Sequence, residues 1–267
     1  MRRPTWKRVI GIVGGLGPHA HLTLEREILR AVHWARRDQD YPPWVLVSRP
    51  QTPDRTAALL GSGSSPGPFL VAALRALAEQ ADFAVLACIT AHAFLQEIRS
   101  QVAIPILDVP EEAIASIAHL GHRRAGVLAT TGTLRAGIFS RASQRVAPQL
   151  ELVSLLDLPR GETLQRKLVM DPIYGGSETE PTAASLKAGS GVDARRREAL
   201  VKPLRDAAMH LVQEGADVIL LGCTEIPLAL GHEPVAGVPL LDPLRAAAEA
   251  AVTIARGGRD LPGEPSP

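Results

Sequence analysis

Cysteine is scarce in this chain of 267 residues, which contains only Cys88 and Cys223. Two cysteines are too few for a disulfide framework, and too few for a zinc site unless histidine or carboxylate side chains contribute. An excess of charge is also lacking, because the formal net charge at pH 7 is +1. We therefore expect no metal, and neither a nucleic acid nor an anionic membrane as partner.

Long hydrophobic runs are missing as well. The basic segment from Met1 to Arg8 is followed by an apolar stretch that extends only from Val9 to Val13 before glycines begin. Such a stretch is too short for the core of a signal peptide, and no other segment has the length to span a bilayer. We expect a cytoplasmic location, and the length suits a globular enzyme of one or two domains.

The two cysteines lie at matching places in two copies of one pattern. Ala81–Cys88 and Ala216–Cys223 each begin with Ala-Asp and continue as a short apolar run that ends in cysteine. Such runs are typical of buried parallel strands, and ligands in open α/β sheets collect at the carboxyl ends of the strands. One thiol in each half therefore suggests two acid/base groups that face one substrate across a cleft.

Two further matches in the same order extend this repeat. Val9–Gly15 resembles Arg124–Thr130, and Ala103–Asp108 resembles Gly237–Asp242. A general likeness among apolar strands is the alternative explanation for any one of these matches. Three matches in one order favour an internal duplication.

Apolar runs and helical patterns alternate along the chain. Strands are expected near residues 8–13, 44–48, 83–87, 104–107, 125–129, 150–154, 217–221 and 238–241. Helices are expected near residues 20–37, 53–60, 69–80, 92–100, 110–119, 134–146, 159–168, 193–214 and 242–256. This alternation predicts an α/β fold of two similar parallel-sheet domains, with the active site in the cleft between them.

The domain boundaries follow from the repeat. We expect the first domain to span residues 1–112 and to be completed by about 226–258, and the second domain to span residues 113–225. Residues 171–192 are expected to be the longest irregular stretch, and a loop of that length is usually a lid or disordered. Residues 259–267 are expected to form a disordered tail.

The turn after the first expected strand, Gly15–Ala20, has the sequence GLGPHA and formally matches the dinucleotide-binding pattern G-x-G-x-x-A. Asp38 or Asp40 would supply the acidic residue that such a site needs about 20 residues further on. Pro18, however, removes an N–H that a pyrophosphate would use. Because glycine turns suit any ligand that approaches backbone N–H groups, we favour a carboxylate-binding turn and expect no cofactor.

Several longer motifs follow one another along the chain. They are GGLGP at 14–18, PQTPDRT at 50–56, CITAH at 88–92 and GCTEIP at 222–227, with the shorter fragments DQD at 38–40, IY at 173–174 and KAG at 187–189. In this order they resemble the PLP-independent aspartate/glutamate racemase superfamily, and most closely its aspartate racemase branch. The resemblance covers almost the whole chain, and it is more specific for the superfamily than for a substrate.

The resemblance implies two similar α/β domains with the active site between them, a homodimer, and no cofactor. It implies that Cys88 and Cys223 are catalytic: one removes the proton on the carbon α to a carboxylate, and the other delivers a proton to the opposite face. The chemistry is plausible because a free cysteine, with a pKa of about 8.5, can act as acid or as base. The alternative is that both are buried small hydrophobes, the usual role of a free cysteine.

The resemblance also assigns substrate-binding residues. Arg55 is expected to grip the substrate carboxylate, a task that suits its bidentate fork. Lys187, on the mobile loop of the family, is expected to reach the other carboxylate of the substrate. The remaining expected substrate-binding residues lie in the glycine turn, beside the thiols and in a threonine-rich turn: Gly15, Leu16, Gly17, Thr90, Thr224, Thr130 and Thr131.

Structural roles are the alternatives to these assignments. Arg55 would then be a surface helix residue, and the threonines from Thr130 onwards would cap the helix expected to begin near Leu134. His92 and Glu225 follow the two cysteines at expected helix starts. Helix capping or polar contacts in the core explain these two residues as well as catalysis does.

Two positions depart from the family pattern. Ile89 stands where the family usually has an asparagine that is expected to hydrogen-bond the amino or carboxylate group of the substrate. Arg49, which precedes the PQT motif, would bring an extra cation to the pocket or point to solvent. We expect both residues to contact the substrate. Because a site that loses a polar partner binds different substrates, these two departures suggest an altered substrate.

The leading hypothesis is a cofactor-independent racemase or epimerase acting on a small carboxylate, with aspartate as the default substrate. The alternative is a related two-cysteine isomerase, lyase or decarboxylase that acts on a non-standard carboxylic acid in specialised metabolism. Hypotheses from other classes are a nicotinamide-dependent oxidoreductase that uses the glycine turn, and a catalytically inactive binding protein.

Overall fold

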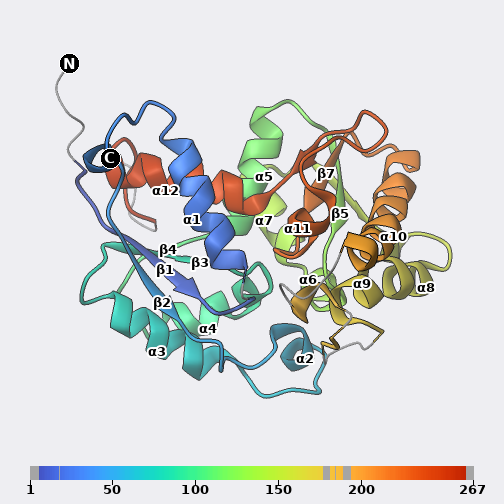
Figure 1. Ribbon diagram of the computed structural model, residues 1–267, viewed down its shortest axis with the longest axis horizontal. Helices are drawn as coiled ribbons and strands as arrows, with labels where there is room; N and C mark the ends of the chain where they lie inside the picture. Colours follow the sequence, from blue (N-terminus) through green and yellow to red (C-terminus); the bar gives the residue numbers. More distant parts are fainter. Residues whose placement is uncertain (1–5, 18, 177–180, 184, 189–193, 263–267) are drawn as a thin grey trace.

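The computed structural model describes residues 6–17, 19–176, 181–183, 185–188 and 194–262. They include two four-stranded parallel sheets, with strand orders β2-β1-β3-β4 and β6-β5-β7-β8 (Figure 1). The strands are β1 (Ile10–Gly14), β2 (Trp44–Ser48), β3 (Phe83–Leu86), β4 (Ile106–Leu107), β5 (Arg124–Leu128), β6 (Glu151–Ser154), β7 (Val218–Leu221) and β8 (Leu240–Leu241). The predicted α/β fold with two similar parallel sheets is confirmed, and each strand end lies within two residues of its predicted place.

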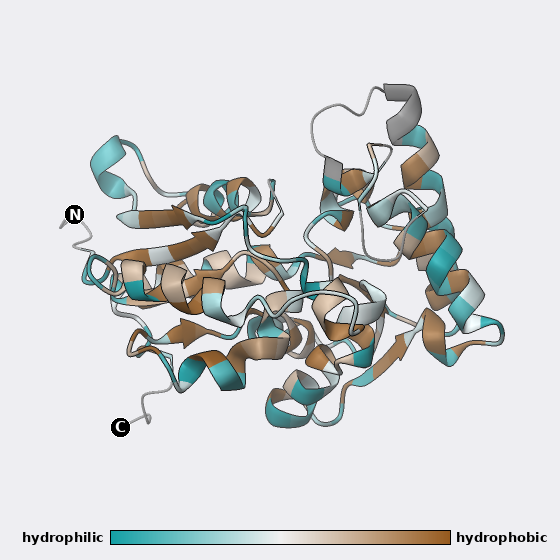
Figure 2. Cartoon of the chain, turned by 90° about the horizontal axis from the view of Figure 1, so that it is seen from below, coloured by the Kyte–Doolittle hydropathy of each residue, from teal (hydrophilic) through white to brown (hydrophobic). Residues whose placement is uncertain are grey.

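The two sheets repeat one pairing scheme. β1 lies between β2 and β3, and β5 lies between β6 and β7, always in parallel. The strands β1, β3 and β7 are buried along their whole length, as expected for apolar runs in a parallel sheet that is covered on both faces. The edge strand β2 is mostly half-buried. In Figure 2 the strands are largely brown, and teal polar residues gather on the outer helices.

Equivalent glycines allow the same close approach in both halves. A Cβ added to Gly11 in β1 would lie 3.1 Å from the Cβ of Ala81, and one added to Gly126 in β5 would lie 3.2 Å from the Cβ of Ala216. These separations are tighter than ordinary side-chain contacts, so both positions favour glycine. The duplication therefore includes the packing of β1 against the residue that precedes β3, and of β5 against the residue that precedes β7.

Equivalent aspartates also form equivalent hydrogen bonds. The carboxylate of Asp82 accepts the backbone N–H of Val9 at 2.6 Å. That of Asp217 accepts the equivalent N–H of Arg124 at 3.3 Å, and also the N–H of Arg123 at 2.9 Å. In each half, the aspartate before the strand that carries the cysteine thus fixes the start of the neighbouring central strand.

Twelve α-helices are found among the described residues. They are α1 (Ala20–Ala31), α2 (Arg55–Leu59), α3 (Gly67–Leu77), α4 (Leu95–Arg99), α5 (Val109–His119), α6 (Thr131–Arg135), α7 (Ile138–Val146), α8 (Gly161–Gln165), α9 (Asp171–Tyr174), α10 (Ala194–Gln213), α11 (Ile226–Leu230) and α12 (Pro243–Arg256). Asp108 and Asp242, equivalent in the repeat, cap α5 and α12 by accepting the N–H groups of Glu111 and Leu244.

Several predicted segments differ from the structure. The helix expected at 20–37 ends at Ala31. The helix expected at 134–146 is divided into α6 and α7, because Gly137 adopts a left-handed conformation with φ of 60°. The helix expected at 92–100 begins as a 3₁₀ turn, η2 (Thr90–Phe94), that continues into α4. The stretch 171–192, expected to be irregular, contains α9 and a 3₁₀ turn, η5 (Leu186–Ala188); its residues 177–180, 184 and 189–192 lie outside the described residues.

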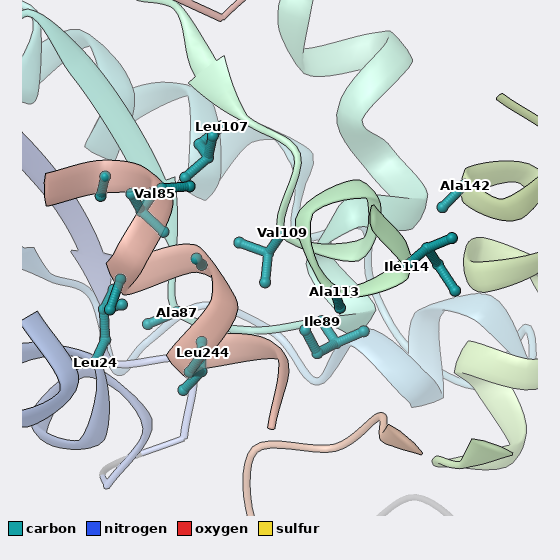
Figure 3. Close-up of a cluster of buried hydrophobic side chains, with 14 of the residues drawn as sticks. Leu24, Val85, Ala87, Ile89, Leu107, Val109, Ala113, Ile114, Ala142 and Leu244 are labelled. Carbon is teal, nitrogen blue, oxygen red and sulfur yellow. The ribbon is translucent and has the colours of Figure 1, made fainter. Parts of the chain in front are cut away.

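The last helix joins the two halves. α12 packs against α1 and α5, and α5 packs against α7 of the second half. One apolar cluster extends through these helices, and Figure 3 shows Leu24 of α1 and Leu244 of α12 on one side of it and Ala142 of α7 on the other. The halves are therefore held by a shared core.

The segment 226–258, expected to complete the first domain as a block, is divided between the halves. β8 pairs with β7 in the second sheet, whereas α12 lies on α1. Of the expected tail, residues 259–262 are described: Arg259 forms an ion pair with Glu112 at 2.7 Å, and Leu261 packs on the core. Residues 263–267 lie outside the described residues. No helix in the described part of the chain has the length and apolar character to cross a membrane.

Candidate active site

A small pocket with a cavity volume of about 10 Å³ lies at the carboxyl ends of β3 and β7. Cys88 follows β3 and Cys223 follows β7, and both thiols line this pocket although each cysteine is buried. The lining residues are Leu16, Arg55, Thr56, Cys88, Ile89, Thr90, Thr130, Lys187, Cys223, Thr224 and Glu225. Because they come from both halves, the pocket exists only when the halves are packed together.

His92 supports the backbone around Cys88. Its Nδ1 lies 2.9 Å from the carbonyl oxygen of Cys88 and its Nε2 lies 3.3 Å from the backbone nitrogen of Val109. Since the N–H of Val109 must donate to Nε2, the ring proton is on Nδ1 and donates to the carbonyl. Burial lowers the pKa of His92, which keeps this ring neutral. His92 is therefore a polar contact of the core that ties the Cys88 turn to the start of α5.

Glu225 contacts the other thiol directly. The Sγ of Cys223 donates to Oε2 of Glu225 at 3.0 Å, and Oγ1 of Thr224 donates to the same oxygen at 3.0 Å. Burial and the negative charge of Glu225 together raise the pKa of Cys223 well above its ordinary value, although Lys187 opposes this effect. Cys223 is therefore held as a protonated thiol, a form that can donate a proton.

Arg55 brings a buried cation to the pocket. Its guanidinium donates to the carbonyl of Leu16 at 2.6 Å and to that of Pro53 at 3.1 Å, while its Nε, also buried, has no hydrogen-bond partner among the described residues. Burial lowers the pKa of Arg55, but its neighbours Cys88, Asp54 and Glu225 together raise it. A buried donor without a partner is costly, so Nε is available to an anionic ligand.

Lys187 is already paired inside the pocket. Its Nζ lies 2.6 Å from Oδ2 of Asp54 and 4.3 Å from the centre of the Tyr174 ring, whose hydroxyl also donates to Asp54. Burial raises the pKa of Asp54, but the charge and hydrogen bond of Lys187, the N–H of Ala57 and the charge of Arg55 together lower it. Burial also lowers the pKa of Lys187, but Glu225, Tyr174 and Asp54 raise it, and the net effect is a raised pKa. Asp54 and Lys187 therefore form a charged pair across the two halves.

A chain of threonine hydroxyls crosses the pocket. Oγ1 of Thr56 donates to that of Thr130 at 3.1 Å, Thr130 contacts Thr133 at 3.0 Å, and Thr133 contacts Thr90 at 2.8 Å. Thr130 also caps α6 by accepting the N–H of Thr133. The capping role considered from the sequence is thus real, and Thr130 lines the pocket as well.

The glycine turn shapes one wall of the pocket from behind. Gly15 has a φ of +75°, and a Cβ there would lie 2.6 Å from the backbone of Arg49 and Pro50. Gly17 has a φ of +141°, and a Cβ there would lie 2.7 Å from the carboxylate of Glu225. Neither glycine lines the pocket, but both conformations and both close approaches require glycine. Pro18 lies outside the described residues.

Most residues predicted for the site meet in this pocket, but four are absent from its lining: Gly15 and Gly17 of the glycine turn, and Arg49 and Thr131. Arg49 is exposed and is absent from the lining; its backbone instead forms a turn in which its carbonyl accepts the hydroxyl of Thr52. Thr131 is buried behind the pocket, where its hydroxyl accepts from Gln165 at 3.4 Å and it faces a neighbouring groove. The expectation that Arg49 and Thr131 bind the substrate therefore lacks support in this structure.

Four residues at the site were not predicted from the sequence as substrate contacts: Asp54, Thr56, Tyr174 and Glu225. Asp54 and Thr56 belong to the motif at 50–56, and Glu225 belongs to the motif at 222–227. The sequence therefore marked these residues as part of the family pattern, but it did not show which groups they contact. Glu225 was left open between capping and catalysis, and its contact with Cys223 favours a role at the site. Among the described residues, no group of three or more His, Cys, Asp or Glu is placed to hold a metal ion.

Together, the duplicated sheets and the pocket define a class of two-domain α/β protein with one thiol contributed by each half. The family model for Asp/Glu/hydantoin racemases matches residues 13–251, so the chain belongs to this family.

Relatives of known name share part of this chain. The broad specificity amino-acid racemase RacX of Bacillus subtilis is 28% identical over 136 residues, which cover 50% of this chain and 59% of RacX. Glutamate racemase of Corynebacterium kroppenstedtii is 29% identical over 157 residues, which cover 58% of this chain and 46% of that enzyme. The matches thus span about half the length of these relatives.

Solved structures share the whole fold. Picrophilus torridus aspartate racemase superimposes with a TM-score of 0.72 at 23% identity, covering 95% of this chain and 96% of that one. An aspartate racemase homologue from Pyrococcus horikoshii superimposes with a TM-score of 0.63 at 22% identity, covering 92% and 98%. At such identities the likeness establishes the two-domain fold alone.

Proposed function

We propose that this protein is a cofactor-independent racemase or epimerase that inverts the carbon α to a carboxylate by a two-cysteine, two-base mechanism. The observation that carries the proposal is that Cys88 and Cys223, one from each half, line one small closed pocket together with a buried arginine. Inversion through a planar intermediate needs a base on one face and an acid on the other. In this proposal the two thiols, which follow equivalent strands of the two halves, supply this base and this acid.

The substrate carboxylate binds at Arg55 in this proposal. The unpartnered Nε of Arg55 supplies one donor, and the hydroxyls of Thr56, Thr90 and Thr130 supply others that are oriented by their mutual hydrogen bonds. When the α-proton leaves, negative charge moves onto the carboxylate. Fixed donors in a buried site stabilise that charge most strongly, because they need not reorganise as it develops.

The thiols exchange roles during turnover. The thiolate of one cysteine takes the α-proton and becomes a thiol, and the thiol of the other gives its proton to the opposite face and becomes a thiolate. Atoms and charge balance without a cofactor, since one proton is taken up by the enzyme and one is released to the substrate. Aspartate is the default substrate, in keeping with the aspartate racemase folds among the structural relatives.

Incubation with L-aspartate and, separately, L-glutamate in D₂O without PLP tests the proposal. NMR follows exchange of the α-proton, and chiral chromatography follows inversion. We expect exchange with racemisation by the unaltered protein, and loss of racemisation by about 10²–10⁴-fold in Cys88→Ser and in Cys223→Ser. Asp206→Asn, an exposed carboxylate-to-amide change on α10, is the control that should keep full activity. Racemisation that survives both cysteine substitutions would contradict the mechanism.

Ile89 favours a second candidate function, a related isomerase, lyase or decarboxylase that uses the same thiols on a different carboxylic acid. Its side chain is buried and lines the pocket beside Cys88, where it has no polar group to bind an amine. If neither amino acid exchanges, carboxylic acids that lack an α-amine are the next substrates to supply. A reaction on such an acid that depends on Cys88 would support this function, and Ile89→Asn should then weaken it.

A further inference from the structure

The duplication allows the surroundings of the two thiols to be compared position by position. Counting from each cysteine, Thr90 in the first half occupies the place of Glu225 in the second half. Thr90 directs its hydroxyl to Thr133 at 2.8 Å, whereas Glu225 directs its carboxylate to Sγ of Cys223 at 3.0 Å. The two halves therefore place a neutral hydroxyl near one thiol and an anion against the other.

Charged groups of other elements make this difference larger. Cys88 has the guanidinium of Arg55 as its charged neighbour. Cys223 faces Glu225 at contact distance, with Lys187 as the opposing cation. Lys187 is itself neutralised by Asp54 at 2.6 Å, so its influence on Cys223 is reduced. The groups that face this thiol pair are Arg55, Lys187, Asp54, Tyr174 and Glu225.

We propose that Glu225 is a positioning residue that holds the proton on Cys223, so that the resting enzyme carries its thiolate at Cys88 and its thiol at Cys223. The proposal rests on the proposed two-cysteine function and adds to it which thiol is the base at rest. The S–H of Cys223 is aimed at Oε2 of Glu225, and the same oxygen is fixed by the hydroxyl of Thr224 at 3.0 Å.

This assignment has a consequence for the proton balance. In one direction of turnover the Cys88 thiolate accepts the α-proton and Cys223 donates its proton, so the enzyme is left with a thiol at Cys88 and a thiolate at Cys223. That thiolate then stands against the carboxylate of Glu225, and the two like charges repel at short distance. Transfer of one proton from Cys88 back to Cys223, directly or through solvent, restores the resting form.

The test needs no substrate, because thiolates absorb in the ultraviolet and thiols do not. Absorbance is followed against pH for Cys88→Ser, which leaves only Cys223, and for Cys223→Ser, which leaves only Cys88. The double variant lacking both thiols is subtracted to remove the tyrosine signal. We expect the thiolate step of Cys88→Ser at a pH roughly 1–3 units above that of Cys223→Ser.

Removal of the Glu225 charge is the decisive variant. Adding Glu225→Gln to Cys88→Ser should lower the pH of its thiolate step by about one unit or more, because the amide still accepts the S–H but carries no charge. Adding the same substitution to Cys223→Ser should move its step less. Glu249→Gln, an exposed change on α12, should move neither step.

The proposal is overturned if Glu225→Gln leaves the Cys223 step in place, or if Cys88→Ser forms its thiolate at the lower pH. Circular dichroism checks that each variant is folded. If Glu225→Gln does not fold, Glu225→Asp replaces it, since the shorter side chain withdraws the carboxylate from Sγ; an unchanged step there equally overturns the proposal. Because titration is independent of turnover, failure of the racemase proposal and failure of this one give separate results.

Discussion

Cys88 and Cys223 stand at the same place in two copies of one fold, but the groups around them differ. Each follows a buried strand, and in each half an aspartate before that strand holds the start of the neighbouring central strand. Around Cys88 the contacts are a neutral His92 and the cation of Arg55, whereas Cys223 donates to the carboxylate of Glu225. The comparison teaches that the duplicated fold sets where the thiols lie, whereas residues that differ between the halves, such as Glu225, set the charges around them.

Among the residues that differ around the two thiols, Arg55 should have the largest effect on activity when it is replaced. Replacing Arg55 by methionine removes the buried charge and the free Nε donor while keeping much of the volume. We expect the rate of α-proton exchange to fall about 10²–10³-fold, because the carbanion loses a fixed donor. Arg49→Met is the matched control: that arginine is exposed, and its loss should change stability by less than about 0.5 kcal/mol. Equal losses in both variants would contradict the site.

His92 has no counterpart beside Cys223, where Pro227 stands at the same spacing. Replacing His92 by phenylalanine leaves the N–H of Val109 and the carbonyl of Cys88 without their partner, so we expect a loss of about 2–3 kcal/mol in the free energy of unfolding. Urea denaturation measures it, with the exposed His119→Phe as control.

The same variant has a predicted pH signature. Because burial lowers the pKa of His92, the unfolded chain takes up a proton that the folded chain refuses as the pH falls below 6.5. This contribution of His92 therefore lowers stability as the pH falls through that range. His92→Phe should remove this part of the pH dependence, and an unchanged slope would contradict a buried neutral ring.

Replacing each of the two capping aspartates, Asp242 and Asp108, by asparagine should change stability with opposite signs. Burial raises the pKa of Asp242 to about 6, so its folded form binds more protons than the unfolded chain between pH 4 and 6, and stability falls as the pH rises through this window. Asparagine keeps the helix cap but does not ionise. The effect of Asp242→Asn on the free energy of unfolding should therefore be more favourable at pH 7 than at pH 4, by up to about 3 kcal/mol. Asp108 instead pairs with Arg99 and Arg145, and Asp108→Asn should lose roughly 0.5–1 kcal/mol. Thermal unfolding at both pH values measures these changes.

The smallest expected difference, that between two equivalent substitutions, tests the duplication itself. Asp82→Ala and Asp217→Ala each remove an acceptor for a backbone N–H at the start of a central strand, and each should cost about 1 kcal/mol. The values should agree within about 0.5 kcal/mol, as measured by urea denaturation. A large cost at one position and none at the other would show that the halves do not share this support.

The fold could be predicted largely from the sequence, because central parallel strands are buried on both faces and appear as apolar runs such as Phe83–Leu86 and Val218–Leu221. Their carboxyl ends then placed both cysteines at one site. The path of the chain between halves was harder: β8 and α12 are neighbours in sequence but belong to different halves. The apolar pattern of a helix predicts that one of its faces is buried, but it does not identify the element against which that face packs.

The site was predicted less fully than the fold. Residues next to a cysteine, such as Thr90 and Thr224, could be placed from strand geometry alone. The orientation of Arg49 and Thr131 depends on turns and on packing against other elements, and the sequence does not encode these locally. The contact of Glu225 with Cys223 likewise depends on side-chain rotamers, although an acid in place of Thr90 was visible in the repeat.

The most direct test of the central claim, that the two thiols serve opposite faces of one carbon, is enantiomer-resolved exchange in D₂O. The substrate that the unaltered protein racemises is supplied as pure L or pure D form to Cys88→Ser and to Cys223→Ser, and loss of the α-proton is followed by NMR. The account predicts that each variant exchanges one enantiomer only, and that the two variants choose opposite enantiomers. Exchange of the same enantiomer by both variants would contradict it.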